Sequence, residues 1–417
     1  MTDPDRRSAV AAAVADAHRR EWAFVLAATA RVAGSIDLAE ECVQDAYGAA
    51  LDAWLREGVP RSPGAWLTTT ARRRAIDVLR REQTLRRKLP LLVDPLGEEE
   101  RAVDPGEVIL DDRLRLVFTC CHPALAREAQ VALTLRLVCG LRTDEIARAF
   151  LVSEPTMAAR VTRAKKKISG AGIPYRIPSA ADLPERLDAV LTVVHLLFTT
   201  GHAAPAGDTL VRADLVERAL DLGRMLAMLM PDEPEVRGLL ALMLLTDARR
   251  AARLDEAGAL VLLEDQDRLR WDPRAIDEGL LLVDGLGHGR PGRFALQAAI
   301  AAVHARAVSW RDTDWALVLL LYDALLVVWP SPVVALNRVV AVLMVSGPAV
   351  ALAEVEALES DSRLVGYRYL AATKADLLRR LARDGEAASA YREALALTDN
   401  AAERAFLSRR LSSVSRS

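Results

Sequence analysis

The 417-residue chain has few of the features that mark secreted or membrane proteins. Its four cysteines are too few for a disulfide framework, which predicts a reducing compartment. Residues 1–20 are charged and lack the sustained apolar core of a signal peptide. The most apolar stretch, residues 315–330, is too short to span a bilayer and carries Asp323, which favours a buried helix. These absences predict a cytoplasmic protein that does not associate with membranes.

Aromatic residues make up only 5% of the chain, and no run alternates convincingly between polar and apolar residues, so strands are not expected. Hydrophobic residues reach 52%, enough for substantial cores. Ala, Leu, Arg and Glu dominate the composition, which suits helices. The length predicts two or three domains. The composition therefore indicates an all-α protein.

The sequence also lacks the signatures of enzymes. It contains no Gly-rich phosphate loop, nucleophile elbow or paired-carboxylate motif. Its scattered histidines are interpreted as core or helix-end residues: His195, His202, His288 and His304. We therefore expect neither enzymatic activity nor a cofactor.

One group of residues suggests zinc at first sight: Cys120, Cys121, His122 and Cys139. Metal sites usually use spaced ligands, whereas adjacent helical residues diverge by about 100°. Cys120 and Cys121 cannot easily share one ion. Buried thiols between helices are the favoured interpretation, and no metal is expected.

Charge is distributed unevenly, although the net charge is only −2. Residues 61–90 hold nine Arg and Lys against two acids, a local excess of seven positive charges. Residues 94–112 hold eight acids against one Arg, a local excess of seven negative charges. Such asymmetry favours different partners for different segments.

Residues 141–168, LRTDEIARAFLVSEPTMAARVTRAKKKI, predict two short helices joined by a tight turn. Ser153 can cap the second helix, with Pro155 in its first turn. That helix has one apolar face, formed by Met157, Val161, Ala164 and Ile168. The pattern is typical of a helix-turn-helix whose second helix enters a major groove, although an ordinary helical hairpin with a basic end fits the spacing too.

Two further helices are predicted near the N-terminus, over residues 38–55 and 65–82, with a Pro- and Gly-containing loop between them. The first carries an acidic outer face. The second has an apolar side and many arginines, which suit either a solvated face or phosphate binding. Trp54 and Trp66 lie among apolar residues, so core packing is favoured over base stacking.

The stretches LAEECVQDAYGAALDAW and SPGAWLTTTARRRAIDVLRRE resemble region 2 of the extracytoplasmic-function sigma factors of RNA polymerase. Residues 141–168 resemble region 4 of the same family, part of the sigma-70 family. The region 4 match includes Ala147, Val152, Ser153, Thr156, Arg160 and Arg163. Leu151 departs from the pattern, which usually has Gly in the turn. The resemblance implies a protein that binds core RNA polymerase and promoter DNA.

By this resemblance, region 2 melts and captures the −10 element. The residues implied are Val59, Arg61, Ser62, Arg72, Arg73, Arg80 and Arg81. The loop residues suit a pocket for an extruded base, and the arginines suit phosphates. The acidic face of the preceding helix corresponds to the surface that docks on the polymerase largest subunit. Its residues are Glu40, Glu41, Gln44 and Asp45.

Region 4 would read the −35 element. The positions implied to face base edges are Ala158, Ala159, Thr162 and Arg163. The alanines suit thymine methyl groups, and the arginine suits guanine. The positions assigned to the DNA backbone are Thr156, Arg160 and Lys165.

The domain boundaries are predicted from composition and resemblance together. Region 2 covers residues 1–83, an acidic flexible linker covers 84–112, and region 4 covers 113–170. The linker either threads the RNA exit path or acts as an inert spacer. A second linker, 171–183, leads to a helical domain over 184–417.

Residues 184–417 predict consecutive helices, and Ala387, Tyr391, Ala394 and Leu395 match the second helix of a tetratricopeptide repeat. We expect a degenerate helical solenoid. The segment also resembles the C-terminal extension of one sigma-factor subgroup, which implies a regulatory role and leaves open a small regulatory protein partner. The predicted function is an alternative sigma factor. The alternative is a stand-alone helix-turn-helix regulator with a ligand- or peptide-sensing solenoid.

Overall fold

The computed structural model describes residues 3–88, 112–150, 152–173, 175–179, 181–203, 206–207, 211–256, 258–287 and 289–415. Leu151, His288 and most of the predicted linker 84–112 lie outside this set. The described residues form helices and two strands of two residues each, so the predicted all-α class is confirmed. The chain divides into two compact units, Met1–Val193 and Val194–Ser417. Each unit is described by itself.

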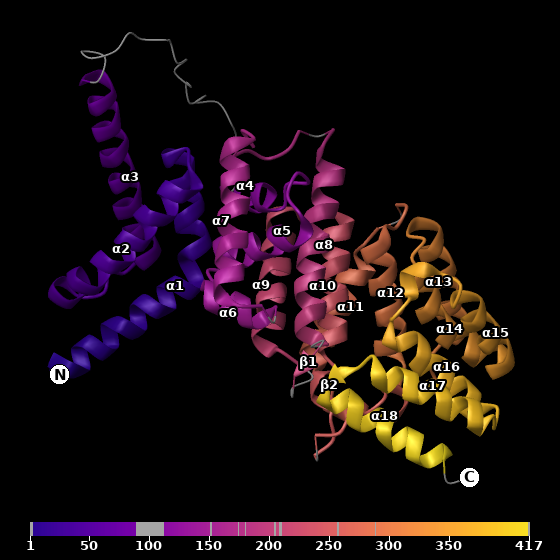
Figure 1. Ribbon diagram of the computed structural model, residues 1–417. Coiled ribbons are helices and arrows are strands. Elements are labelled where there is room, and N and C mark those ends of the chain that lie inside the picture. The colour runs from indigo at the N-terminus through magenta and orange to yellow at the C-terminus, as the bar shows by residue number, and fades with distance from the viewer. Residues whose placement is uncertain are drawn as a thin grey trace. The chain divides into compact units, whose positions relative to one another are not determined.

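The N-terminal unit begins with three helices that pack on one another (Figure 1). Its helices are α1 (Asp3–Ala33), α2 (Ile36–Glu57), α3 (Pro63–Lys88), α4 (Asp112–Cys120), α5 (Arg127–Leu133), the π-helical segment η2 (Thr134–Val138), α6 (Thr143–Ala149), α7 (Glu154–Gly170) and α8 (Leu183–His202), which continues into the second unit.

Local sequence sets the ends of α2. The Ser35 side chain accepts a hydrogen bond from the Leu38 backbone N–H at its start. Gly58 ends the helix with φ +87°, a conformation that side chains rarely adopt, and its N–H donates to the Trp54 carbonyl over 3.0 Å. These two caps direct the chain from α2 into the loop before α3.

Small residues allow the first three helices to approach closely. Ala46 and Ala50 on α2, and Ala71 and Ala75 on α3, are fully buried. Leu67 is buried beside them, as the predicted apolar side of α3 requires. Burying this face is the main source of stability for the bundle, because apolar area removed from water stabilises by about 25 cal/mol per Å².

The second unit is a succession of helices, each packed on its neighbour (Figure 1). Its elements are β1 (Ala206–Gly207), α9 (Ala213–Leu229), α10 (Pro234–Asp247), η3 (Arg250–Ala252), η4 (Leu263–Asp265), η5 (Arg268–Arg270), α11 (Pro273–Asp284), α12 (Arg293–Arg306), α13 (Trp315–Val328), α14 (Pro332–Ser346), α15 (Pro348–Leu358), η6 (Ser362–Leu364), α16 (Arg368–Arg380), α17 (Asp384–Ala396), β2 (Asp399–Asn400) and α18 (Ala401–Val414). Contacts between successive helices are the pattern of a solenoid.

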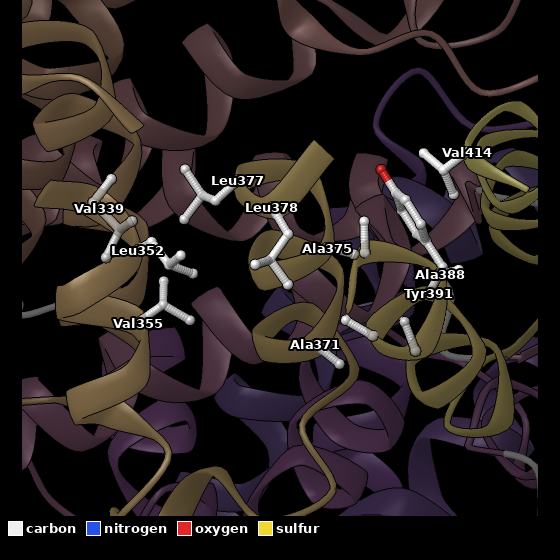
Figure 2. Close-up of a cluster of buried hydrophobic side chains, with 14 of the residues drawn as sticks. Val339, Leu352, Val355, Ala371, Ala375, Leu377, Leu378, Ala388, Tyr391 and Val414 are labelled. Carbon is white, nitrogen blue, oxygen red and sulfur yellow. The ribbon is translucent and has the colours of Figure 1, made fainter. Parts of the chain in front are cut away.

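Side chains of α14 to α18 form one apolar cluster in this unit (Figure 2). Val339 and Val355 are fully buried in it, and Tyr391 is 2% exposed. Ala387 and Ala394 are also fully buried, in agreement with their predicted positions in a tetratricopeptide-like helix. The short strands β1 and β2 pair in parallel, which joins the start of the unit to its last helices.

The structure differs from the sequence prediction at the boundary between the units. The predicted C-terminal domain begins at residue 184, whereas the compact units divide between Val193 and Val194, inside α8. The first turns of α8 belong to the N-terminal unit, where Arg186 donates a 2.6 Å hydrogen bond to the Phe118 carbonyl. A single continuous helix therefore contributes to both units. Among the described residues, no helix is long and apolar enough to cross a membrane.

Candidate functional site

The helix-turn-helix consists of α6 and α7. Ser153 precedes α7, and its side-chain oxygen accepts a hydrogen bond from the Thr156 backbone N–H over 3.3 Å, as predicted for the cap. The apolar face of α7 is buried at Met157, Val161, Ala164 and Ile168. This burial fixes the rotation of α7, so the opposite face is presented to solvent.

The four positions assigned to base edges share that exposed face. Ala158, Ala159, Thr162 and Arg163 are all exposed. Of the residues assigned to the DNA backbone, Thr156 is exposed and Arg160 is partly buried. The Thr156 hydroxyl also shares a 2.8 Å hydrogen bond with the Ser153 hydroxyl. A helix that presents small, polar and cationic side chains together has the surface needed to enter a major groove.

Lys165 differs from the prediction, because its ammonium group lies against α2. Its Nζ atom is 2.5 Å from Glu40 Oε2 and 3.0 Å from Asp37 Oδ1. Burial alone would lower the pKa of Lys165, but the hydrogen bonds and charges of Glu40 and Asp37 outweigh burial and raise it. These two ion pairs direct the Lys165 side chain toward α2. In this conformation it is not available to a phosphate.

Glu40 also differs from the prediction, which puts it on the exposed acidic face of α2. It is only 5% exposed. One carboxylate oxygen pairs with Lys165, and the other lies 2.5 Å from Arg136 Nη2, on the π-helical segment η2. Glu40 is therefore the anion between two cations of the region 4 segment. We call Glu40, Arg136 and Lys165 the buried ion triad.

The remaining acidic face of α2 is open to solvent. Glu41, Gln44 and Asp45 are exposed. Asp45 also accepts a 2.5 Å hydrogen bond from Arg74 of α3, so its charge is partly neutralised within the bundle. The predicted polymerase-docking surface is thus reduced to three exposed residues, with Glu40 beneath them.

The residues assigned to the −10 element lie on α3 and on the loop before it. Val59, Arg61 and Ser62 of the loop are exposed, and so are Arg73, Arg80 and Arg81 of α3. Arg72 is partly buried. Trp54 is 1% exposed and contacts Trp66 edge-on, with ring centroids 5.8 Å apart. The interpretation of Trp54 as a core residue is confirmed.

Helix α1 also contacts the region 4 segment, which the sequence does not predict. The Trp22 indole N–H donates a 3.0 Å hydrogen bond to the Leu137 carbonyl of η2. Gly140 follows with φ +69°, and a Cβ atom there would lie 3.0 Å from the Trp22 ring. The positive φ and the close indole both favour glycine at this position. The only available signal was the isolated Gly140 between two predicted helices.

The segment after α7 contacts both α1 and α4 through Tyr175. The Tyr175 hydroxyl lies within hydrogen-bonding distance of the Ala27 carbonyl, at 3.1 Å, and of the Asp112 carbonyl, at 3.2 Å. Burial, with the charge of Asp112, raises the pKa of Tyr175. The described residues of the N-terminal unit therefore join the α1–α3 bundle to the helix-turn-helix through buried polar contacts.

The cysteines near α4 are packed in the core, as favoured from the sequence. Cys120 and Cys121 are buried, and the Cys121 sulfur lies 3.5 Å from the Thr134 hydroxyl. Burial raises the pKa of Cys121 to about 12, so its thiol stays protonated. No group of potential metal ligands occurs among the described residues.

Comparison with known proteins assigns three parts of the chain. Residues 18–84 match Sigma-70 region 2, residues 115–168 match Sigma-70, region 4, and residues 186–286 match a family of unknown function, DUF6596. An uncharacterized protein of Rhizobium meliloti (strain 1021), R00370, is 48% identical over 379 residues, which cover 89% of each chain. No solved structure matches the chain.

The two sigma regions occur in order along the chain. The region 2 match covers most of the α1–α3 bundle, and the region 4 match contains the helix-turn-helix with its exposed recognition face. The chain therefore belongs to the sigma-70 family and is a DNA-binding sigma factor that takes part in promoter recognition and transcription initiation.

Proposed function

We propose that the protein is an alternative sigma factor that brings core RNA polymerase to a specific set of promoters. In this role α3 and the loop before it hold the −10 element, and α7 reads the −35 element. Catalysis belongs to the polymerase. The observation that carries the proposal is the exposed side of α7 assigned to base edges. The opposite side of α7 is buried, and this fixes which side chains can meet the groove.

We further propose that the contact between α2 and α7 opens when the promoter is bound. The −10 and −35 elements are roughly 25 base pairs apart, which is about 85 Å at 3.4 Å per base pair. Ion pairs of 2.5 Å join α2 to η2 and α7 in the N-terminal unit. Both elements cannot be bound while those pairs persist. Opening would release Glu40 to the docking face and Lys165 to a phosphate.

The C-terminal helices are proposed to modulate this activity. The support is architectural: a solenoid presents extended surface for binding, and sigma regions 2 and 4 already account for promoter contacts. A small regulatory protein remains a proposed partner of this domain.

Run-off transcription with purified core polymerase tests the proposal. The templates are genomic fragments, including the region upstream of the gene. The full chain is compared with a chain ending at His202, which retains all of α8 and the Arg186 contact. Initiation by the full chain supports the sigma assignment, and the change on truncation gives the sign of the C-terminal effect.

A stand-alone helix-turn-helix regulator is the alternative, favoured by the open recognition face alone. Affinity capture of core polymerase by the full chain separates the two. The alternative needs no polymerase, so absence of capture and of initiation would reject the sigma proposal.

A further inference from the structure

A cavity lined by both polar and apolar side chains lies in the C-terminal unit, between residues of α10, α12, α13 and α14. Its volume is about 320 Å³, and an adjoining cavity of about 170 Å³ shares His304, Tyr322 and Asn337 with it. The larger cavity falls in the volume range of small-molecule sites. One part of the wall is apolar, with Leu242 and Ile300 among its residues.

Arg249 lines this cavity immediately after α10. None of the described residues that line the two cavities is Asp or Glu, and no described carboxylate is among the groups that influence the charge of Arg249. Burial is the main influence on its charge, followed by repulsion from Arg253 and Arg268, and together they lower the pKa of Arg249 to about 10. The cavity wall therefore contains a desolvated cation without an anion.

The neighbouring arginines make the contrast clear. Arg250 forms two hydrogen bonds with the Asp247 carboxylate, of 2.8 and 2.7 Å. Arg253 donates to the His202 carbonyl, and Arg268 donates to the carbonyls of His304 and Ala307. These neighbours have acceptors within the fold, so the lack of one at Arg249 is specific to the cavity.

Other polar groups of the same wall also lack partners. The Trp271 indole nitrogen and the His304 Nδ1 atom are buried and make no hydrogen bond with the described residues. Gln297 and Asn337 add amide groups to the lining. Buried polar groups without hydrogen bonds are costly, and the Trp271 N–H can only donate, which favours a ligand that supplies an acceptor here.

We propose that this cavity binds a small organic anion, whose carboxylate or phosphate group pairs with Arg249 and whose apolar body lies against Leu242 and Ile300. An arginine presents a planar fork of donors that matches either group. The apolar wall selects ligands with a hydrophobic body over inorganic ions. This site goes beyond promoter recognition and does not depend on it.

Calorimetric titration of the full chain tests the proposal with four probes: benzoate, phenyl phosphate, benzyl alcohol and inorganic phosphate. Ionic strength is held constant. We expect benzoate or phenyl phosphate to bind, with at least a tenfold loss of affinity in Arg249→Met. Arg249→Lys should retain part of the affinity, because it keeps the charge. The matched control is Arg392→Met, an exposed arginine of α17 outside the cavity, which should bind as the parent chain does.

Three results would overturn the site. They are no binding of either aromatic anion up to about 10 mM, equal losses in the Arg249 and Arg392 variants, and inorganic phosphate or benzyl alcohol binding as tightly as the aromatic anions.

Thermal unfolding without any probe separates a binding role of Arg249 from a structural one. Arg249→Met should melt at or above the parent temperature, because it removes an unpaired cation, and a marked drop would make Arg249 structural. Transcription is not part of these readouts, so the sigma proposal is tested separately.

Discussion

At the residue scale, exposure separates the side chains that can meet DNA from those engaged in the fold. Arg163 and Lys165 lie two positions apart on α7 and were both assigned to DNA from the sequence. Arg163 is exposed, whereas the ammonium group of Lys165 is held by Glu40 and Asp37. A shift of two positions on a helix turns a side chain from one face toward another, which is sufficient to give these cations different environments.

Replacing Arg163 by Ala should relax specificity at one position of the −35 element. The expected loss is about 1–3 kcal/mol on the preferred base pair and much less on the others, because a base contact is removed. This loss is measured as the affinity of the polymerase carrying this protein for promoters varied at each −35 position. Lys166→Ala, an exposed neighbour, is the control and should weaken all sequences equally. A uniform loss for Arg163→Ala would instead identify a phosphate contact.

His195 should make the C-terminal unit sensitive to acid. Burial, followed by repulsion from Arg293, lowers the pKa of His195 from 6.5 to about 4. The unfolded chain therefore binds a proton that the folded chain does not, so this stability is complete above pH 6.5 and is lost as the pH falls through about 4. At 1.36 kcal/mol per pKa unit, the change is about 3 kcal/mol.

Urea unfolding between pH 7.5 and 4 checks this expectation. His195→Gln should flatten the pH dependence by about that amount. His122→Gln in the N-terminal unit is the control and should flatten it less. An unchanged slope in the His195 variant would refute the assignment.

At the element scale, α2 has two roles on two edges. Its outer edge presents Glu41, Gln44 and Asp45, and its inner edge supplies Glu40 to the buried ion triad. Glu40 and Lys165 are 125 residues apart in the chain, so no local pattern could predict their pairing. The sequence identified the acidic helix correctly but could not determine which acid would be covered.

Glu40→Gln should destabilise the N-terminal unit by about 2 kcal/mol, because two partly buried cations lose their shared anion. Urea unfolding at pH 7 measures the loss. Glu41→Gln, one residue further and exposed, should change stability by less than about 0.5 kcal/mol. A double-mutant cycle with Lys165→Met should give a coupling energy well above zero. Equal effects of the Glu40 and Glu41 changes would show that the triad contributes nothing to stability.

The outer edge of α2 is tested by reversing its charge. Glu41→Lys with Asp45→Lys should weaken binding to core polymerase, because the proposed docking face is acidic. The Asp45 change also breaks its pair with Arg74, so Arg74→Ala alone serves as the control. Affinity for core polymerase is the measurement, with circular dichroism to show that helix content is unchanged. Unaltered affinity would remove the docking assignment.

At the scale of the whole molecule, promoter binding should separate α2 from α7. Fluorescence labels at Asp52→Cys on α2 and Ser169→Cys on α7 report the distance, since both positions are exposed. Burial raises the pKa values of Cys42, Cys120 and Cys121, which keeps these thiols poorly reactive, and Cys139 is replaced by Ser. Energy transfer should be high in the free protein and fall when core polymerase and promoter are added together. Transfer that stays high in an actively initiating complex would disprove the proposed opening.

The sequence by itself determined the helices, because their signals are local. Among the consecutive helices predicted over residues 184–417, α11 has clear local signals, since Asp272 caps it and Pro273 begins it. The cap at Ser153 and the buried stripe of α7 followed in the same way. The sequence pattern also identified both sigma regions.

Tertiary structure alone decided which charged residues are paired and where a cavity forms. Glu40 meets Arg136 and Lys165, and Arg249 pairs with no described acid, because helices distant in sequence pack in a particular order. Helical periodicity specifies which face a residue occupies, but it does not specify which neighbour covers that face. Burial and ion pairing depend on that neighbour, so they were settled only by the packing of the folded chain.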